Sequence, residues 1–151
     1  MSITSLSPAQ ISALSVTAIQ GLSTTTIGQL SASQVAAINT TGIGALNATQ
    51  VSALSTTQMR ALTTTQIPNF SSDITFSSAQ LLALNGSQIG VFAATQVANF
   101  GVTAISGFAT TQVQALSATN VSALDATQAA ALTATQIASL TTTQIGGLNA
   151  T

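Results

Sequence analysis

Few residues of this chain have side chains that could carry out chemistry. Arg60, Asp73 and Asp125 are the charged residues, 2% of the 151 residues, where about 25% is ordinary. With no His and no Cys, the chain lacks an imidazole base, a thiolate nucleophile and soft-metal ligands. The two Asp lie far apart in sequence and make no carboxylate pair, and the many Ser and Thr hydroxyls have no base to activate them. We therefore expect no catalytic residue, no metal site, no cofactor and no enzymatic activity.

The low charge also bears on partners. The formal net charge is −1 and the mean hydropathy is +0.54, a combination that favours self-association. A basic surface for phosphates is missing, so we expect no nucleic-acid partner. Polar residues interrupt every apolar run before it reaches the roughly 18 residues of a membrane-spanning helix. The start, MSITSLSPAQ, has neither the basic nor the apolar region of a classical signal peptide.

The chain is built from repeats of eight residues, which must position all of its side chains. The chain divides into a partial octad (1–6), eight octads (7–70), a hexad SSDITF (71–76), nine octads (77–148) and a second partial octad (149–151). Position 1 of the octad is mostly Ser, Thr or Asn, position 4 mostly Gln, position 5 Ile or Val, and position 8 Leu, Ile or Phe. Such regular columns are typical of a solenoid, in which each repeat is stabilised by its neighbours.

The octad predicts a short helix. Ser/Thr-x-x-Gln is a capping box with position 1 as N-cap and Gln at N3, and the flanking apolar residues fall at hydrophobic-staple positions. Asn39, Asn47, Asn85 and Asp125 are suitable N-caps, and Pro8 falls at N1, where proline is well tolerated. We predict an all-α solenoid of very short capped helices, one per octad. The alternative is a β-solenoid, because Thr, Ile and Val favour strands and Gln columns can stack; the apolar spacing of three and five argues against it.

The two partial octads complement each other. Residues 2–6 correspond to positions 4 to 8, and residues 149–151 correspond to positions 1 to 3. With Met1 removed, one chain's end and the next chain's start would form one octad, so we expect a head-to-tail homopolymer. The residues predicted at this subunit junction are Ser2, Ile3, Leu6, Leu148, Asn149, Ala150 and Thr151.

The middle of the chain departs from the pattern. Pro68 falls inside a predicted helix and should break it, so the stretch around the hexad predicts a kink or a changed register, or alternatively a contact site. All the phenylalanines close a unit in this region, and they indicate either a wider core or a lateral contact between filaments. They are Phe70, Phe76, Phe92, Phe100 and Phe108.

Two resemblances accompany the pattern. SLSPAQISAL (residues 5–14) resembles the first helix of a transcription activator-like effector repeat, which implies a capped helix. The DNA function does not carry over, because the 34-residue unit and the basic surface are missing. The wider pattern L-[ST]-[TA]-[TA]-Q-[IV]-x-[AG]-L resembles repeats of low-charge bacterial secreted and surface proteins. That resemblance implies an extracellular structural role.

These observations lead to a functional expectation. We expect a structural subunit that polymerises head-to-tail into a filament or sheath, outside the cell or on its surface. The alternative is a solenoid binding module of a bacterial adhesin or of an ice-binding surface protein. Ice binding would need a flat, regular array of Thr on β-structure, which an α-solenoid does not provide.

Overall fold

The computed structural model describes residues 3–148, and this part of the chain contains helices and no strand. The predicted all-α solenoid of short helices is confirmed, and the β-solenoid is not supported. The helices are four to seven residues long. They are α1 Pro8–Ser12, α2 Val16–Gln20, α3 Thr24–Gln29, α4 Ala32–Ala37, α5 Thr40–Gly44, α6 Ala48–Ser52, α7 Thr56–Ala61, α8 Ser78–Ala83, α9 Gly86–Gly90, α10 Ala94–Val97, α11 Val102–Gly107, α12 Thr110–Ala115, α13 Ala118–Ser122, α14 Ala126–Ala130, α15 Ala134–Ser139 and α16 Thr142–Leu148, with 3₁₀ turns η1 Ile3–Ser5 and η2 Ile67–Asn69.

Most helices begin at the cap predicted from the sequence, whereas α10, α11 and α12 begin after Ala93, Gly101 and Ala109, which form no side-chain cap. At Ser7 the backbone is extended, the hydroxyl accepts from the Gln10 amide at 3.3 Å, and Gln10 Oε1 accepts from the Ser7 amide at 2.9 Å. Pro8 follows at N1. The same reciprocal box forms at Ser31, Asn47, Ser55, Ser77, Asn85, Asp125 and Thr133. Because these bonds satisfy the first amides of a helix, an octad that carries such a cap can start a helix of its own.

The helices end without a left-handed residue. At Leu30, position 8 of its octad, the amide donates to the Ile27 carbonyl at 3.2 Å and the backbone is extended, with φ −61° and ψ 139°. The next residue, Ser31, is also extended and already caps α4. No positive φ occurs in the described part of the chain. The turn between helices is therefore made by ordinary extended residues at positions 8 and 1.

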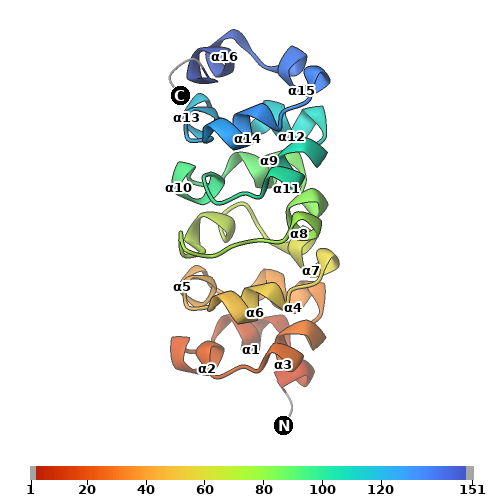
Figure 1. Ribbon diagram of the computed structural model, residues 1–151. Coiled ribbons are helices and arrows are strands. Elements are labelled where there is room, and N and C mark those ends of the chain that lie inside the picture. Colours follow the sequence, from red (N-terminus) through yellow and green to blue (C-terminus); the bar gives the residue numbers. More distant parts are fainter. Residues whose placement is uncertain (1–2, 149–151) are drawn as a thin grey trace.

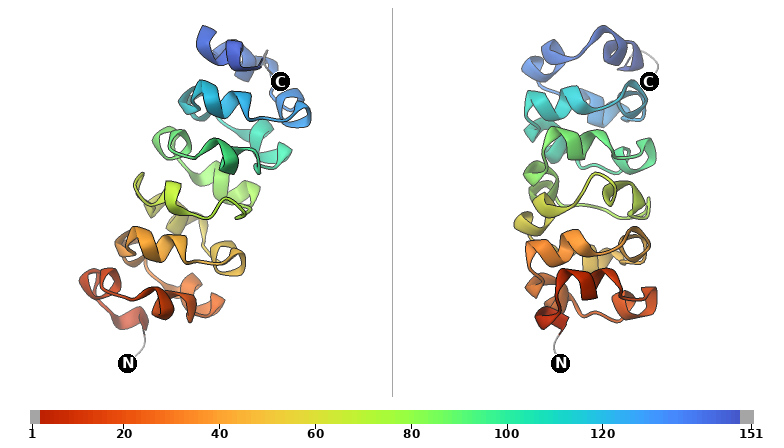
Figure 2. Two further views of the ribbon diagram at one scale, coloured as in Figure 1. Left: turned by 90° about the vertical axis from the view of Figure 1, so that its left-hand side faces the viewer. Right: turned by 180° about the vertical axis from the view of Figure 1, so that it is seen from behind.

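The helices wind into a stack of coils, with the N-terminal helices at one end and the C-terminal helices at the other (Figures 1 and 2). Below, a unit is an octad or the hexad, and a coil is one full turn of the solenoid. Helices three units apart lie against each other, as α1 does with α4 and α13 with α16. Helix α7 contacts α8 across the hexad, so the hexad takes the place of one unit.

The core consists of positions 5 and 8. Position 5 side chains from Ile11 to Val121 are at most 1% exposed, and position 8 side chains from Leu30 to Phe108 are at most 5% exposed. They form one continuous cluster along the array. A single octad contributes two such side chains, so its helix is stable only between neighbours.

The irregular stretch fits into this core. Pro68 reduces its octad to the 3₁₀ turn η2, as predicted, and residues 71–76 contain no helix. Ile74 and Phe76 are nonetheless buried in the same cluster. The core is therefore continuous through the irregular stretch, because two apolar residues of the hexad replace those of an octad.

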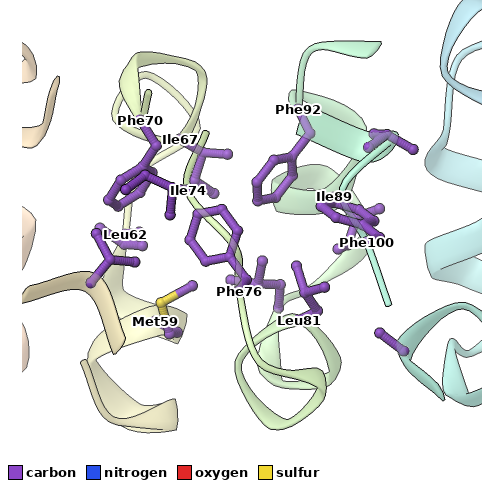
Figure 3. Close-up of a cluster of buried hydrophobic side chains, with 14 of the residues drawn as sticks. Met59, Leu62, Ile67, Phe70, Ile74, Phe76, Leu81, Ile89, Phe92 and Phe100 are labelled. Atoms are coloured by element: carbon purple, nitrogen blue, oxygen red, sulfur yellow. The ribbon is translucent and has the colours of Figure 1, made fainter. Parts of the chain in front are cut away.

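The phenylalanines form a stack inside the array around the hexad (Figure 3). Successive rings meet edge to face, with centroids 5.1 to 6.0 Å apart, a favourable geometry for aromatic pairs. The rings are 3 to 5% exposed. This burial agrees with the wider-core interpretation, and it leaves the rings inside the array, away from any lateral neighbour.

Candidate functional site: an amide ladder between coils

The glutamine at position 4 joins two coils. In Gln58, Oε1 accepts from the Ser55 amide at 2.8 Å, which completes the cap of α7. The Nε2 group points the other way and donates to the carbonyls of Ile27 at 2.8 Å and Leu30 at 2.7 Å. The side chain is 2% exposed. One amide therefore caps its own helix and also binds the end of the helix four units earlier.

This arrangement repeats along the chain, and we call it the amide ladder. Its acceptors are mainly the carbonyls of positions 5 and 8, usually 31 and 28 residues earlier. Every buried side-chain nitrogen or oxygen in the described residues has a hydrogen-bond partner. The other glutamines of the ladder are Gln34, Gln50, Gln66, Gln80, Gln88, Gln96, Gln112, Gln128, Gln136 and Gln144.

Asparagine supplies the bridging amide in two of the octads that lack glutamine at position 4. Position 4 of one octad is Gly42, and there the cap residue Asn39 accepts from the Gly42 amide at 2.8 Å and donates to the Ser12 carbonyl at 2.9 Å. Asn120 occupies position 4 itself and donates to the Phe92 carbonyl at 3.1 Å. The bridging amide is thus preserved although the residue that carries it changes.

The ladder continues across the hexad. Gln80 donates to the carbonyls of Val51 and Leu54, 29 and 26 residues earlier. Both separations are two shorter than usual, which is the difference between an octad and the hexad. The spacing along the sequence therefore changes at the hexad, but the glutamine still bonds to positions 5 and 8 of the unit four earlier.

A second inter-coil contact joins position 6 to position 7 three units later. A Cβ built on Gly90 would lie 2.7 Å from the Ala115 carbonyl oxygen, so glycine permits a close approach of the two backbones. Elsewhere a long side chain donates across the same gap: Arg60 Nε to the Ala83 carbonyl at 3.3 Å, and Gln114 Nε2 to that of Ser139 at 3.2 Å. This contact was not predictable from the sequence, because residue types vary at position 6.

The N-terminal end of the array has an unused side-chain donor. Gln10 forms its capping box but is exposed, and its Nε2 group has no partner among the described residues. The position 8 side chains Leu6, Leu14 and Leu22 are only half-buried. This end resembles an interior coil from which the preceding coil has been removed.

The C-terminal end has the opposite deficit. Ile137 and Ile145, both at position 5, are 44% and 40% exposed. No donor in the described residues reaches the carbonyl oxygens of Leu124, Leu132 and Leu140. This end therefore offers apolar surface and acceptors, the groups that the next coil covers in the interior.

Three of the predicted junction residues fall within the described part of the chain, at these two ends. Ile3, in η1, and Leu6 are half-buried at the N-terminal end, and Leu148 closes α16 at the other end. The Leu6 carbonyl accepts from Gln34 Nε2 at 2.8 Å, so Leu6 takes the position 8 role. Ser2, Asn149, Ala150 and Thr151 lie outside the described residues.

Two of the charged side chains, Asp125 and Arg60, form hydrogen bonds to the backbone. Asp125 caps α14 by accepting from the Gln128 amide at 2.7 Å, and Arg60 contacts the Ala83 carbonyl as described above. Within residues 3–148, no three His, Cys, Asp or Glu side chains gather to hold a metal ion, and no pocket is found. In the same range, no helix is long and apolar enough to cross a membrane.

The fold and the ladder define an all-α solenoid repeat protein. Residues 35–72 match the family model of the ALTTAQ repeat, and the hexapeptide ALTTTQ at residues 61–66 differs from that name by one letter. In the structure this hexapeptide runs from the end of α7 to Gln66 of the ladder. No curated protein and no solved structure matches the chain.

Proposed function

We propose that this protein is a structural subunit that associates with further copies of itself head-to-tail, without catalysis. The observation that carries the proposal is the complementarity of the two ends. Gln10 at one end is an unused donor, and Leu132 and Leu140 at the other end present unused acceptors. Inside the array, the same two sets of groups bind each other at every coil boundary. A heterologous contact of this kind does not close on itself and so produces a filament.

The apolar surface of the C-terminal end supports the same partner. Ile137 and Ile145 are core residues by position, yet each keeps about two fifths of its surface exposed. In the interior a following coil buries this position almost completely, as at Val113. Burying a Leu or Ile side chain is worth about 1.5 to 3 kcal/mol. A second copy placed in register would bury both side chains.

The test replaces the two exposed isoleucines. Ile137→Asp with Ile145→Asp introduces two charges at the proposed contact, and we expect the purified 151-residue chain to change from long fibres to discrete particles in electron micrographs. Val102→Asp is the matched control, since Val102 is 42% exposed on α11, away from either end. Discrete particles from the unmodified chain would contradict the proposal and favour the solenoid binding module.

We also propose that the polymer is located outside a bacterial cell or on its surface, as a filament or sheath. The support is the resemblance of the repeat pattern to secreted and surface repeats, together with the lack of Cys, which suits a polymer that needs no redox control. Antibody labelling of intact cells tests this location. Labelling only after the cells are opened would contradict it.

A further inference from the structure

One wall of the solenoid collects side chains that are rare elsewhere on its surface. Helices α7, α8, α11 and α14 lie one above another, and each contacts the next (Figure 1). In this order they carry the exposed residues Arg60, Leu82 and Val102, with Asp125 as the cap of α14. These residues include the one cation of the chain and one of its two acids. We call this face, defined by the four residues, the charged wall.

Both charges of the wall have polar atoms left for a partner. Arg60 donates from Nε to the Ala83 carbonyl, and Asp125 accepts at Oδ1 from the Gln128 amide. Within residues 3–148, neither group forms another bond. Arg60 and Asp125 lie three coils apart on the wall, or roughly 25 to 30 Å, since packed helices are about 8 to 10 Å apart. The two charges therefore cannot pair inside one molecule.

The centre of the charged wall is apolar. Leu82 and Val102 keep 41% and 42% of their surface exposed. Leu82 lies against the end of α11, because a Cβ on Gly107 would be 3.1 Å from its Cδ2 atom, and Val102 begins the same helix. The exposed residues beside them, Ala79, Ser106 and Gly107, are small, so another surface can approach closely. An apolar centre with a polar rim is the usual anatomy of a protein–protein interface.

We propose that the charged wall binds the same wall of a second copy, with the two solenoids antiparallel. Along the wall the order is cation, apolar, apolar, anion, and this order is complementary to itself when one copy is reversed. Arg60 of each copy then lies at the level of Asp125 of the other, and the apolar residues meet between them. In a parallel pair, Arg60 would face Arg60 and Asp125 would face Asp125, and like charges repel.

The antiparallel contact differs in kind from the head-to-tail contact. A self-complementary patch produces a closed two-fold pair, and its residues lie on the side of the array, away from either end. The pair therefore does not require a filament. If copies also associate head-to-tail as proposed above, each copy adds one such patch, and two filaments would be joined side by side.

Two neutral variants remove the charges and keep the bonds inside the chain. Arg60→Gln retains a side-chain donor at position 6, as Gln114 does in its own octad. Asp125→Asn retains the cap, as Asn47 does at α6. Asp73→Asn is the matched control, because Asp73 lies in the hexad, which contacts α10 and not the charged wall.

Sedimentation equilibrium measures the Kd of the pair, in chains that also carry Ile137→Asp with Ile145→Asp so that end-to-end contacts do not interfere. We expect Arg60→Gln and Asp125→Asn each to raise the Kd about fivefold, because either one removes both copies of the ion pair. The double variant should raise it no further, and Asp73→Asn should not change it. A lower Kd for the neutral variants would overturn the antiparallel direction, and an equal effect of Asp73→Asn would overturn the ion pair.

A second pair of substitutions tests the apolar centre. Leu82→Ser with Val102→Thr removes this centre from both copies, and we expect the Kd to rise about a hundredfold. Val16→Thr is the control, since Val16 is 37% exposed on α2, which belongs to another wall. Monomers at millimolar concentration without any wall substitution, or equal effects of the variant and the control, would overturn the pair. Because the ends are blocked in every sample, a lack of fibres from the unmodified chain would overturn the proposed function and leave this pair intact.

Discussion

The first coil and the interior coils have the same local structure, but only the interior coils have a preceding coil to bind. Gln10 and Gln58 occupy the same position of the same capping box, and their Oε1 atoms accept from the cap amide at 2.9 and 2.8 Å. Gln10 is exposed, whereas Gln58 is buried because its Nε2 group reaches the preceding coil. The comparison separates two functions of one side chain. Capping starts each helix locally, and the inter-coil amide binds one helix to another.

The largest effect expected from this difference is that of a carboxylate in place of the amide. Glu caps as well as Gln at N3, but it cannot donate to the carbonyls of Ile27 and Leu30, and its charge would be buried against them. We expect Gln58→Glu to lower the free energy of unfolding by about 3 to 5 kcal/mol. Gln10→Glu should change it by less than about 0.5 kcal/mol, as an exposed substitution does.

Urea titrations of dilute protein, followed by far-UV circular dichroism, measure both variants. Gln29→Glu, at an exposed position 7, controls for the added charge. Similar losses in Gln58→Glu and Gln10→Glu would show that the glutamine acts through its cap alone.

A smaller contrast is expected in the apolar column at position 5. Ile105 is fully buried, while Ile145 has the same position in the last octad and is 40% exposed. Ile105→Ala should cost about 2 to 5 kcal/mol through lost contacts and a cavity. Ile145→Ala should cost about 1 kcal/mol, because part of that side chain is already in water.

Unfolding titrations of these two alanine variants compare the interior of the array with its end. Equal losses at Ile105 and Ile145 would mean that a following coil adds nothing to the burial of position 5.

The smallest expected effect concerns the caps alone. Ala109 is an N-cap with the usual extended backbone, and its amide donates to Gln112 Oε1 at 2.8 Å. The Gln112 backbone amide donates to the Ala109 carbonyl at 2.9 Å, because the alanine offers no side-chain acceptor. Ala109→Ser should supply that acceptor and raise the free energy of unfolding by about 1 kcal/mol. Ser55→Ala removes the equivalent bond from α7 and should lower it by a similar amount.

Thermal unfolding of the two cap variants measures the expected gain in stability for Ala109→Ser and the expected loss for Ser55→Ala. A fall in stability for Ala109→Ser would show that the cap geometry at that octad differs from the other octads.

Local chemistry made much of this fold predictable from the sequence. The capping box acts over three residues, so the start of most helices, including those capped by Asn39 and Asp125, follows from residue type and spacing. The two apolar columns identified the core in the same way. Even Pro68 acted as expected, because proline disrupts a helix wherever its ring falls inside one.

The inter-coil contacts were not predictable in this way. The partner of Gln58 Nε2 lies 28 to 31 residues earlier, a separation set by the size of a coil and not by the octad. The close approach at Gly90 depends on the same geometry, and the varied residue types at position 6 do not reveal it. The role of the hexad was the least predictable, since only the amide ladder in the structure shows that its six residues replace an octad.

The central claim, that position 4 amides bind one coil to another, is tested most directly by solvent exchange of the side-chain amide protons. In two-dimensional ¹H–¹⁵N spectra of the dilute monomer, the Nε2 protons of Gln58 should exchange slowly, and those of Gln10 should exchange as fast as those of exposed Gln29. Rapid exchange at Gln58 as well would contradict the account, because a buried amide bonded to two carbonyls must be protected.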